Sequence, residues 1–191
     1  MVRGRRPSSG RRSPRYASKT VRIPREDPRV APSAVKRFAT IVANSDTGMR
    51  CAAWYLKNVV PRIEPALSRW SSGRVTSLPI TPVVFLQTNG ARTSKPRATL
   101  LTYFTDGDDV ILIASNYGRP RHPAWYHNVK SQPEVRLRAR GQAGRYLVHE
   151  TAGAERDRLW ALATSWTPPL LKYQAMAGDR TIPVMRCAPM D

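Results

Sequence analysis

The sequence predicts an α+β fold, a small antiparallel β-barrel with flanking helices. From Val83 onward, short apolar or alternating runs are separated by turn residues, which indicates five or six strands joined mostly as hairpins. A few stretches with helical spacing flank these runs. The 191 residues are 41% hydrophobic, which suffices for one buried core. One barrel domain is therefore expected.

The N-terminal region carries much of the positive charge. The formal net charge of the chain is +19, and residues 1–37 hold twelve basic and two acidic residues. Residues 1–32 are rich in Arg, Pro and Ser and poor in apolar side chains, so they bury too little surface to offset the entropy of ordering. This predicts a disordered basic tail over residues 1–32 and a barrel domain over residues 33–191.

Two helical patterns precede the barrel. A short one begins at Ser33, and a longer amphipathic one follows from Met49 to Trp70, where Pro61 and Pro65 should kink or divide it. The longer pattern has basic residues on its other faces. It therefore predicts either a helix that covers the core or one that lies on an anionic membrane surface.

The strands and later helices follow from periodicity and turn chemistry. The continuous apolar run at Val83–Thr88 predicts a strand buried on both faces. Asp106–Asp109 is a tight turn that closes a hairpin, and Thr151 is a plausible cap for a helix. The expected strands are Val83–Thr88, Ala98–Phe104, Val110–Ala114, Glu134–Arg140, Arg145–Glu150 and Ile182–Cys187. The expected helices in this part of the chain are Pro123–Lys130, Ala154–Thr164 and Lys172–Ala177.

Two loops have the composition of anion sites. Thr88–Arg97 combines three cations with hydroxyls and flexible backbone, which suits a phosphate, although a solvated turn has the same composition. Ser115–Asn128 leads into a helix whose free amides favour an anion, and its aromatic residues suit a flat ring. His122 and His127 are poorly spaced for shared metal ligation, and Cys51 and Cys187 lie far apart, so no metal site is expected.

The run from Ala114 to Asn128, which reads ASNYGRPRHPAWYHN, resembles the signature of the deazaflavin-dependent nitroreductase family. Gly90–Arg97 and the stretch from Gln174 to Val184 stand at matching distances, and the resemblance covers roughly residues 47–189. It implies a split β-barrel related to FMN-binding, pyridoxamine-phosphate-oxidase-like proteins. It also implies coenzyme F420 as cofactor, a deazaflavin with a phosphodiester and glutamates in its tail. The implied reaction is hydride transfer to a quinone, a nitro compound or another small organic acceptor.

The resemblance also implies roles for individual residues. The residues matched to the anionic tail are Arg92, Thr93, Ser94 and Arg97. Those matched to the lining of the cofactor pocket are Ala114, Ser115, Asn116 and Tyr117, and those matched to the flanks of the ring are Trp125, Tyr126, His127 and Asn128. Tyr173 is the candidate proton donor on the acceptor side. Ala91 and Leu170 depart from the family pattern, where Arg and Tyr are usual, so the acceptor stays open.

Two other functions fit parts of the sequence. A nucleic-acid-binding protein would use the tail and the alternating arginines of residues 136–140, and a split barrel could instead bind FMN. Neither a membrane-spanning apolar run nor a secretory signal is visible, which predicts a cytoplasmic protein, with contact to the inner face of the membrane as an alternative. A homodimer is also a candidate, since a related barrel family dimerises.

Overall fold

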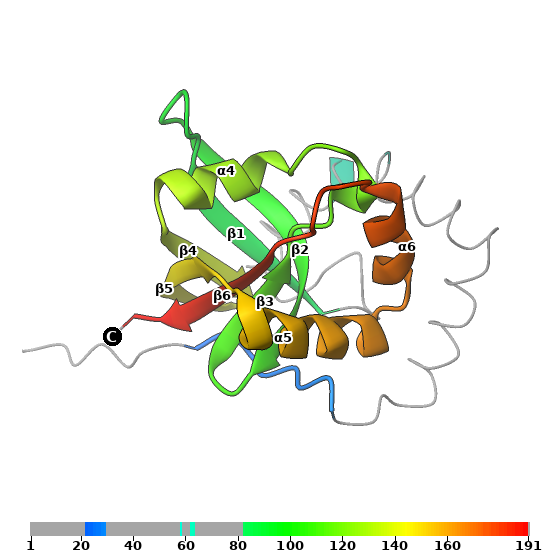
Figure 1. The fold of residues 1–191 in the computed structure, drawn as a ribbon. Helices are drawn as coiled ribbons and strands as arrows, with labels where there is room; N and C mark the ends of the chain where they lie inside the picture. Colours follow the sequence, from blue (N-terminus) through cyan, green and yellow to red (C-terminus); the bar gives the residue numbers. More distant parts are fainter. Residues whose placement is uncertain (1–21, 30–57, 59–61, 64–81, 191) are drawn as a thin grey trace, which may run out of the picture.

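The computed structural model describes residues 22–29, 58, 62–63 and 82–190. Six strands form a closed barrel in the order β1-β2-β3-β6-β5-β4, and every neighbouring pair is antiparallel (Figure 1). The strands are β1 (Val83–Asn89), β2 (Pro96–Asp106), β3 (Asp109–Ile113), β4 (Glu134–Ala139), β5 (Gln142–Glu150) and β6 (Val184–Pro189). The predicted split-barrel fold with flanking helices is confirmed.

The barrel interior follows from the two-residue period of the strands. In β4, Val135, Leu137 and Ala139 point inward and are at most 5% exposed, whereas Arg136 lies outside. The expectation that β1 is buried on both faces is wrong. Val84, Leu86 and Thr88 are buried, but the residues between them are half-buried or exposed, because in the described part of the chain no helix fully covers the outer face of β1.

Within residues 82–190, three α-helices lie outside the barrel (Figure 1): α4 (Ala124–Ser131), α5 (Gly153–Trp166) and α6 (Pro169–Met176). A second apolar cluster joins α5 and α6 to the barrel through Leu159 and Leu170, which pack with Phe104 and Ile111. All three helices were predicted, but Thr151 does not cap α5. Its hydroxyl donates to the carbonyl of Val184 (3.0 Å), and Ala152 is the N-cap residue.

The predicted boundary of the tail does not hold for residues 22–29, which contact the end of the barrel opposite α4 (Figure 1). Ile23 is 4% exposed within the core, and its N–H donates to the Tyr146 hydroxyl (2.9 Å). The Tyr103 hydroxyl donates to the carbonyl of Pro24 (3.0 Å). The backbone of Glu26 exchanges two hydrogen bonds with Thr105. We call residues 22–29 the N-terminal strap.

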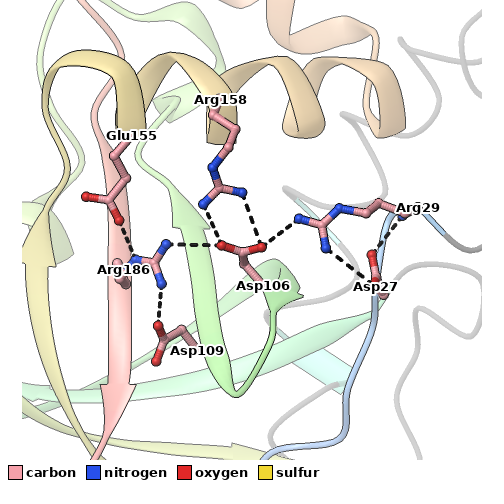
Figure 2. Close-up of polar contacts among 7 residues, drawn as sticks. All are labelled: Asp27, Arg29, Asp106, Asp109, Glu155, Arg158 and Arg186. Atoms are coloured by element: carbon pink, nitrogen blue, oxygen red, sulfur yellow. Dashed lines mark hydrogen bonds and ion pairs between the residues drawn. The ribbon is translucent and has the colours of Figure 1, made fainter.

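A network of ion pairs joins the strap to the β2–β3 hairpin, α5 and β6 (Figure 2). Asp106 accepts from Arg158 of α5 (2.7 Å), from Arg29 of the strap (2.7 Å) and from Arg186 of β6 (3.1 Å). Asp108 pairs with both Arg22 and Arg25. The acidic hairpin predicted as turn chemistry therefore also neutralises three arginines of the N-terminal region.

The rest of the predicted tail and most of the two helical patterns before the barrel lie outside the described residues; Asn58, Arg62 and Ile63 are helical. Within the described residues, no helix is long and apolar enough to cross a membrane. The same part of the chain contains no group of three or more His, Cys, Asp or Glu side chains suited to a metal ion.

Candidate functional site

The β1–β2 loop presents the first group of predicted site residues. Its backbone closes on itself, since Gly90 N–H donates to the carbonyl of Lys95 (2.9 Å) and Ser94 N–H donates to the carbonyl of Gly90 (2.8 Å). The predicted tail-binding residues are all exposed: Arg92, Thr93, Ser94 and Arg97. The loop therefore holds cations and hydroxyls in a compact, solvent-accessible turn.

Asn128 joins this loop to α4. Its side chain is 9% exposed, accepts from Ala91 N–H (3.0 Å) and donates to the Thr88 hydroxyl (3.1 Å). Because a buried amide side chain with both partners satisfied resists rotation, Asn128 holds the loop in place. The structure thus joins the two predicted anion sites, Thr88–Arg97 and Ser115–Asn128, through Asn128. The sequence had matched Asn128 to the flank of a ring, but its side chain bonds to the loop instead.

An open hollow of about 430 Å³ lies beside the loop, on the side of β4. Arg97 and Arg136 bring two cations to it, and Glu134, the acidic residue among its lining, is paired with Arg145 (2.9 Å). The lining residues are Gln87, Thr88, Asn89, Pro96, Arg97, Ala98, Glu134, Val135 and Arg136. The charge around the loop therefore favours an anionic ligand.

The segment after β3 adopts a left-handed turn. Asn116, Tyr117 and Gly118 have φ values of 48°, 56° and 73° and form the short 3₁₀ element η1. Glycine adopts such φ values freely and asparagine tolerates them, so Tyr117 carries most of the backbone strain. Gly118 is required for a second reason, because a Cβ there would lie 2.8 Å from the Cβ of Met176 on α6.

Arg180 holds this turn from the side. Its guanidinium donates to the carbonyls of Ala114 (3.3 Å), Ser115 (2.9 Å) and Arg119 (2.8 Å), which bracket η1. Gln174 of α6 fixes the segment that carries Arg180, since its amide donates to the Arg180 carbonyl (2.8 Å) and accepts from Ile182 N–H (2.8 Å). Ala114 itself is fully buried, so its backbone carbonyl is the part of it that the turn uses.

The first turn of α4 presents stacked rings. His122 and Tyr126 lie 4.4 Å apart at 25°, and His127 meets both edge-on. Burial and then the Arg180 charge lower the pKa of His122, and burial and then the hydrogen bond to Glu150 raise the pKa of Tyr126 to about 12. Both rings are therefore neutral at pH 7. Trp125, also predicted to flank a ring, is instead 5% exposed within the barrel core.

Tyr173 of α6 lies on the other side of the turn. Its ring meets the exposed ring of Tyr117 edge-on, with centroids 6.1 Å apart, and burial is the main cause that raises its pKa. Met176 is 56% exposed on the same helix. Leu170, where the family usually has Tyr, is buried in the apolar cluster beneath α6 and does not belong to this surface.

Together these residues suit an elongated ligand with an anionic end and a flat ring. The cationic loop, the strained turn and the aromatic pair Tyr117–Tyr173 come from β1–β2, η1 and α6, which Figure 1 shows around the same end of the barrel as α4. Sequence reasoning missed Arg180 as a site residue. The stretch from Gln174 to Val184 matched the family pattern. The role of Arg180 could not be predicted from it, because its partners are backbone carbonyls, which any residue type provides.

Comparison with known proteins identifies the family of this chain. Residues 59–189 match the family model described as F420H(2)-dependent quinone reductase. The chain is 45% identical to an F420H(2)-dependent quinone reductase of Mycobacterium tuberculosis over 78 residues. These aligned residues are 40% of this chain. The aligned part spans about half (52%) of that relative's length.

Two solved structures share the fold. One is described as an F420-H2 dependent reductase, with 34% identity and a TM-score of 0.51, over 56% of this chain and 93% of that chain. The other is described as a domain-swapped dimer, with 30% identity and a TM-score of 0.54, over 64% of this chain and 93% of that chain.

Proposed function

Because the chain belongs to the F420H(2)-dependent quinone reductase family, we propose that it catalyses reduction of a quinone-type acceptor by a reduced deazaflavin. The family match over residues 59–189 carries this proposal, and it includes every segment of the candidate site. When bound, the reduced coenzyme F420 supplies a hydride. FMN and nucleic acid, the alternatives left open by the sequence, receive no such support.

The site residues fit the anionic end of this cofactor. We assign Arg92, Thr93, Ser94 and Arg97 to the tail. The first three are exposed on the β1–β2 loop, and Arg97 is exposed at the start of β2, where it reaches the basic hollow. An arginine guanidinium binds phosphate and carboxylate oxygens through paired hydrogen bonds. Asn128 acts through this loop as a positioning residue, because its own side chain is buried and already bonded.

We assign the ring side of the proposed site to Ser115, Asn116 and Tyr117 and to the outer faces of Tyr126 and His127. Ala114 is left out, since it is fully buried and its N–H and carbonyl are bonded to Pro183 and Arg180. Tyr117 and Tyr173 supply an apolar, aromatic wall suited to a flat acceptor. The raised pKa of Tyr173 keeps its hydroxyl protonated at pH 7, so it can donate a hydrogen bond, or a proton, to the reduced acceptor oxygen. Trp125 is left out, since it packs inside the barrel.

The decisive experiment is titration of the purified full chain with oxidised coenzyme F420, followed by the cofactor's fluorescence, beside an FMN titration. We expect micromolar or tighter binding of the deazaflavin and weaker binding of FMN. Reduced cofactor should then be oxidised in the presence of a soluble quinone under anaerobic conditions. Absence of deazaflavin binding would contradict the proposal.

The tail assignment has a matched control. Replacing Arg92 and Arg97 with Gln should weaken deazaflavin binding at least about ten-fold and flatten its salt dependence, because two charge-assisted contacts are lost. Replacing Arg22 and Arg25 with Gln removes two exposed cations that pair with Asp108 of the β2–β3 hairpin, and should change affinity less than about two-fold. Equal effects of both changes would point to bulk charge alone.

We also propose a homodimer and peripheral contact with anionic membrane. The relative described as a domain-swapped dimer supports the first, and the net charge of +19 supports the second. Sedimentation analysis of the full chain should give twice the monomer mass of 21.4 kDa. Co-sedimentation with anionic but not zwitterionic liposomes tests the membrane proposal.

A further inference from the structure

We propose that Arg180 is a positioning residue for the deazaflavin site, which acts by holding the strained turn Asn116–Gly118 in its left-handed form. This inference rests on the proposed function, because it assigns that turn to the ligand. Arg180 itself stands behind the turn and points at backbone carbonyls. Its role is therefore indirect.

The strain is the first step of the argument. Two consecutive non-glycine residues, Asn116 and Tyr117, have positive φ. Asparagine tolerates this conformation, but the side chain of tyrosine makes it unfavourable, so the strain lies mainly at Tyr117. Such a backbone persists only where its surroundings determine it from several sides. Strained backbone of this kind is found preferentially at ligand sites, where the geometry it enforces is useful.

The contacts that determine the turn come from three directions. Two of its own bonds close it, from Gly118 N–H to the Ser115 carbonyl (3.0 Å) and from Arg119 N–H to the Asn116 carbonyl (3.1 Å). The Asn116 side chain donates to the Arg121 carbonyl (2.7 Å). Arg180 spans the whole element, because it is bonded to carbonyls both before and after it.

Only arginine fits this position. A guanidinium offers five N–H groups in a planar fork, and Arg180 uses Nε, Nη1 and Nη2 toward acceptors on residues 114, 115 and 119. A lysine keeps the charge but presents one compact ammonium group, which does not span acceptors on both sides of the turn. Arg180→Lys therefore separates geometry from charge.

Arg180 also fixes the position of the turn relative to neighbouring elements, and we call its contacts with the turn the clamp. Gln174 ties Arg180 to α6, the helix that carries Tyr173, and the guanidinium lies 3.4 Å from Nδ1 of His122, which stacks on Tyr126. A change at residue 180 should therefore loosen the turn relative to both aromatic surfaces. Deazaflavin affinity and its productive orientation should decline together.

A double-mutant cycle distinguishes this role from general stabilisation of the fold. In the natural background, Arg180→Lys should weaken binding of oxidised coenzyme F420 about ten-fold, the equivalent of ~1.4 kcal/mol. In a Tyr117→Gly background, the same change should cost no more than about three-fold, because glycine adopts the left-handed conformation without needing the clamp. Equal losses in both backgrounds would overturn the inference.

A matched control and a ligand-free measurement complete the test. Arg119→Gln removes a cation from the same loop but keeps the carbonyl that Arg180 uses, and should alter affinity less than about three-fold. Hydrogen exchange of the Gly118 and Arg119 amides should accelerate at least about ten-fold in Arg180→Lys while amides in β4 stay unchanged. If the natural protein does not bind the deazaflavin, the proposed function fails. Unchanged exchange in the variant contradicts the clamp independently.

Discussion

At the scale of single residues, α4 divides its side chains between the barrel core, the β1–β2 loop and the candidate site. Trp125 and Asn128 were both matched to the flanks of a ring, yet they have other places in the structure. Trp125 packs in the core and Asn128 holds the β1–β2 loop. The sequence pattern of α4, a helix of eight residues, does not decide which side of the helix faces the barrel. Tyr126 and His127 are comparable in polarity with Trp125 and Asn128, so polarity does not distinguish the two sides. The tertiary contact decides it.

Asn128→Ala should destabilise the protein and weaken deazaflavin binding. The change leaves the buried hydroxyl of Thr88 and the N–H of Ala91 without the partner that each now has, at a cost of about 1–3 kcal/mol. Chemical denaturation measures the first effect and cofactor fluorescence the second. Ser165→Ala, which removes an exposed hydrogen bond to the Leu162 carbonyl within α5, is the control and should change both by little.

Tyr173→Phe should lower kcat and leave cofactor affinity nearly unchanged. The ring that packs on Tyr117 is retained, and only the hydroxyl, which we propose donates to the acceptor, is lost. Removal of a general acid reduces rates by roughly 10²–10⁴-fold, whereas loss of a single neutral hydrogen bond to the acceptor would cost roughly ten-fold. Steady-state assays with a quinone distinguish the two, and an unchanged kcat would remove Tyr173 from the reaction.

At the scale of elements, the strands were readily predicted because each has its own period, turn and polarity. The six predicted runs coincide with the six barrel strands to within a few residues. The strap was not predicted. Its docking depends on charges of opposite sign about 80 residues apart in sequence, Arg29 with Asp106 and Arg25 with Asp108. Local composition indicates only that such a segment cannot fold by itself.

The Asp106 network should make stability depend on pH in acid. Hydrogen bonds from Arg158, Arg29 and Arg186 hold the pKa of Asp106 well below its usual range in the folded protein. A carboxylate with a depressed folded pKa stabilises the protein above its unfolded pKa, about 3.9, and loses that contribution as the pH falls below it. The free energy of unfolding should therefore decrease between about pH 5 and pH 3.

Asp106→Asn should flatten this dependence and lower stability at pH 7, because the amide no longer offers a charge to three guanidinium groups. Asp157→Asn, which changes a carboxylate that is 73% exposed and pairs only with Arg156, is the control and should keep the natural profile. Urea denaturation at each pH gives both curves. An unchanged slope in Asp106→Asn would mean that other carboxylates cause the acid sensitivity.

At the scale of the whole molecule, the net charge of +19 divides between several tasks. Arg22, Arg25 and Arg29 are paired with the β2–β3 hairpin, and Arg180 is bonded to backbone. Arg92 and Arg97 remain exposed at the opposite end. The composition suggested one large polyanion as the partner of this charge. Part of the charge is instead bonded within the protein, and we propose that the exposed part beside the β1–β2 loop binds a small anionic ligand.

Removing residues 1–29 should destabilise the barrel much more than removing residues 1–21. The longer deletion takes away Ile23 from the core and the strap's bonds to Tyr103, Thr105 and Tyr146. Loss of one large buried aliphatic side chain alone costs about 2–5 kcal/mol, and each kcal/mol is worth about 2–4 °C in Tm for a chain of this size. Thermal denaturation of the two truncated chains measures the difference, and equal Tm values would contradict a structural role for the strap.

The strap has a consequence for the order in which the chain is completed. It leaves the ribosome before its partners Asp108 and Tyr146, which are synthesised about 80 and 120 residues later. Contacts so distant in sequence form late, because the intervening chain must be confined first. Until Asp106 and Asp108 have been synthesised, Arg22, Arg25 and Arg29 lack the hairpin carboxylates that pair with them in the folded protein, so this segment of the nascent chain attracts polyanions more strongly than the folded protein does.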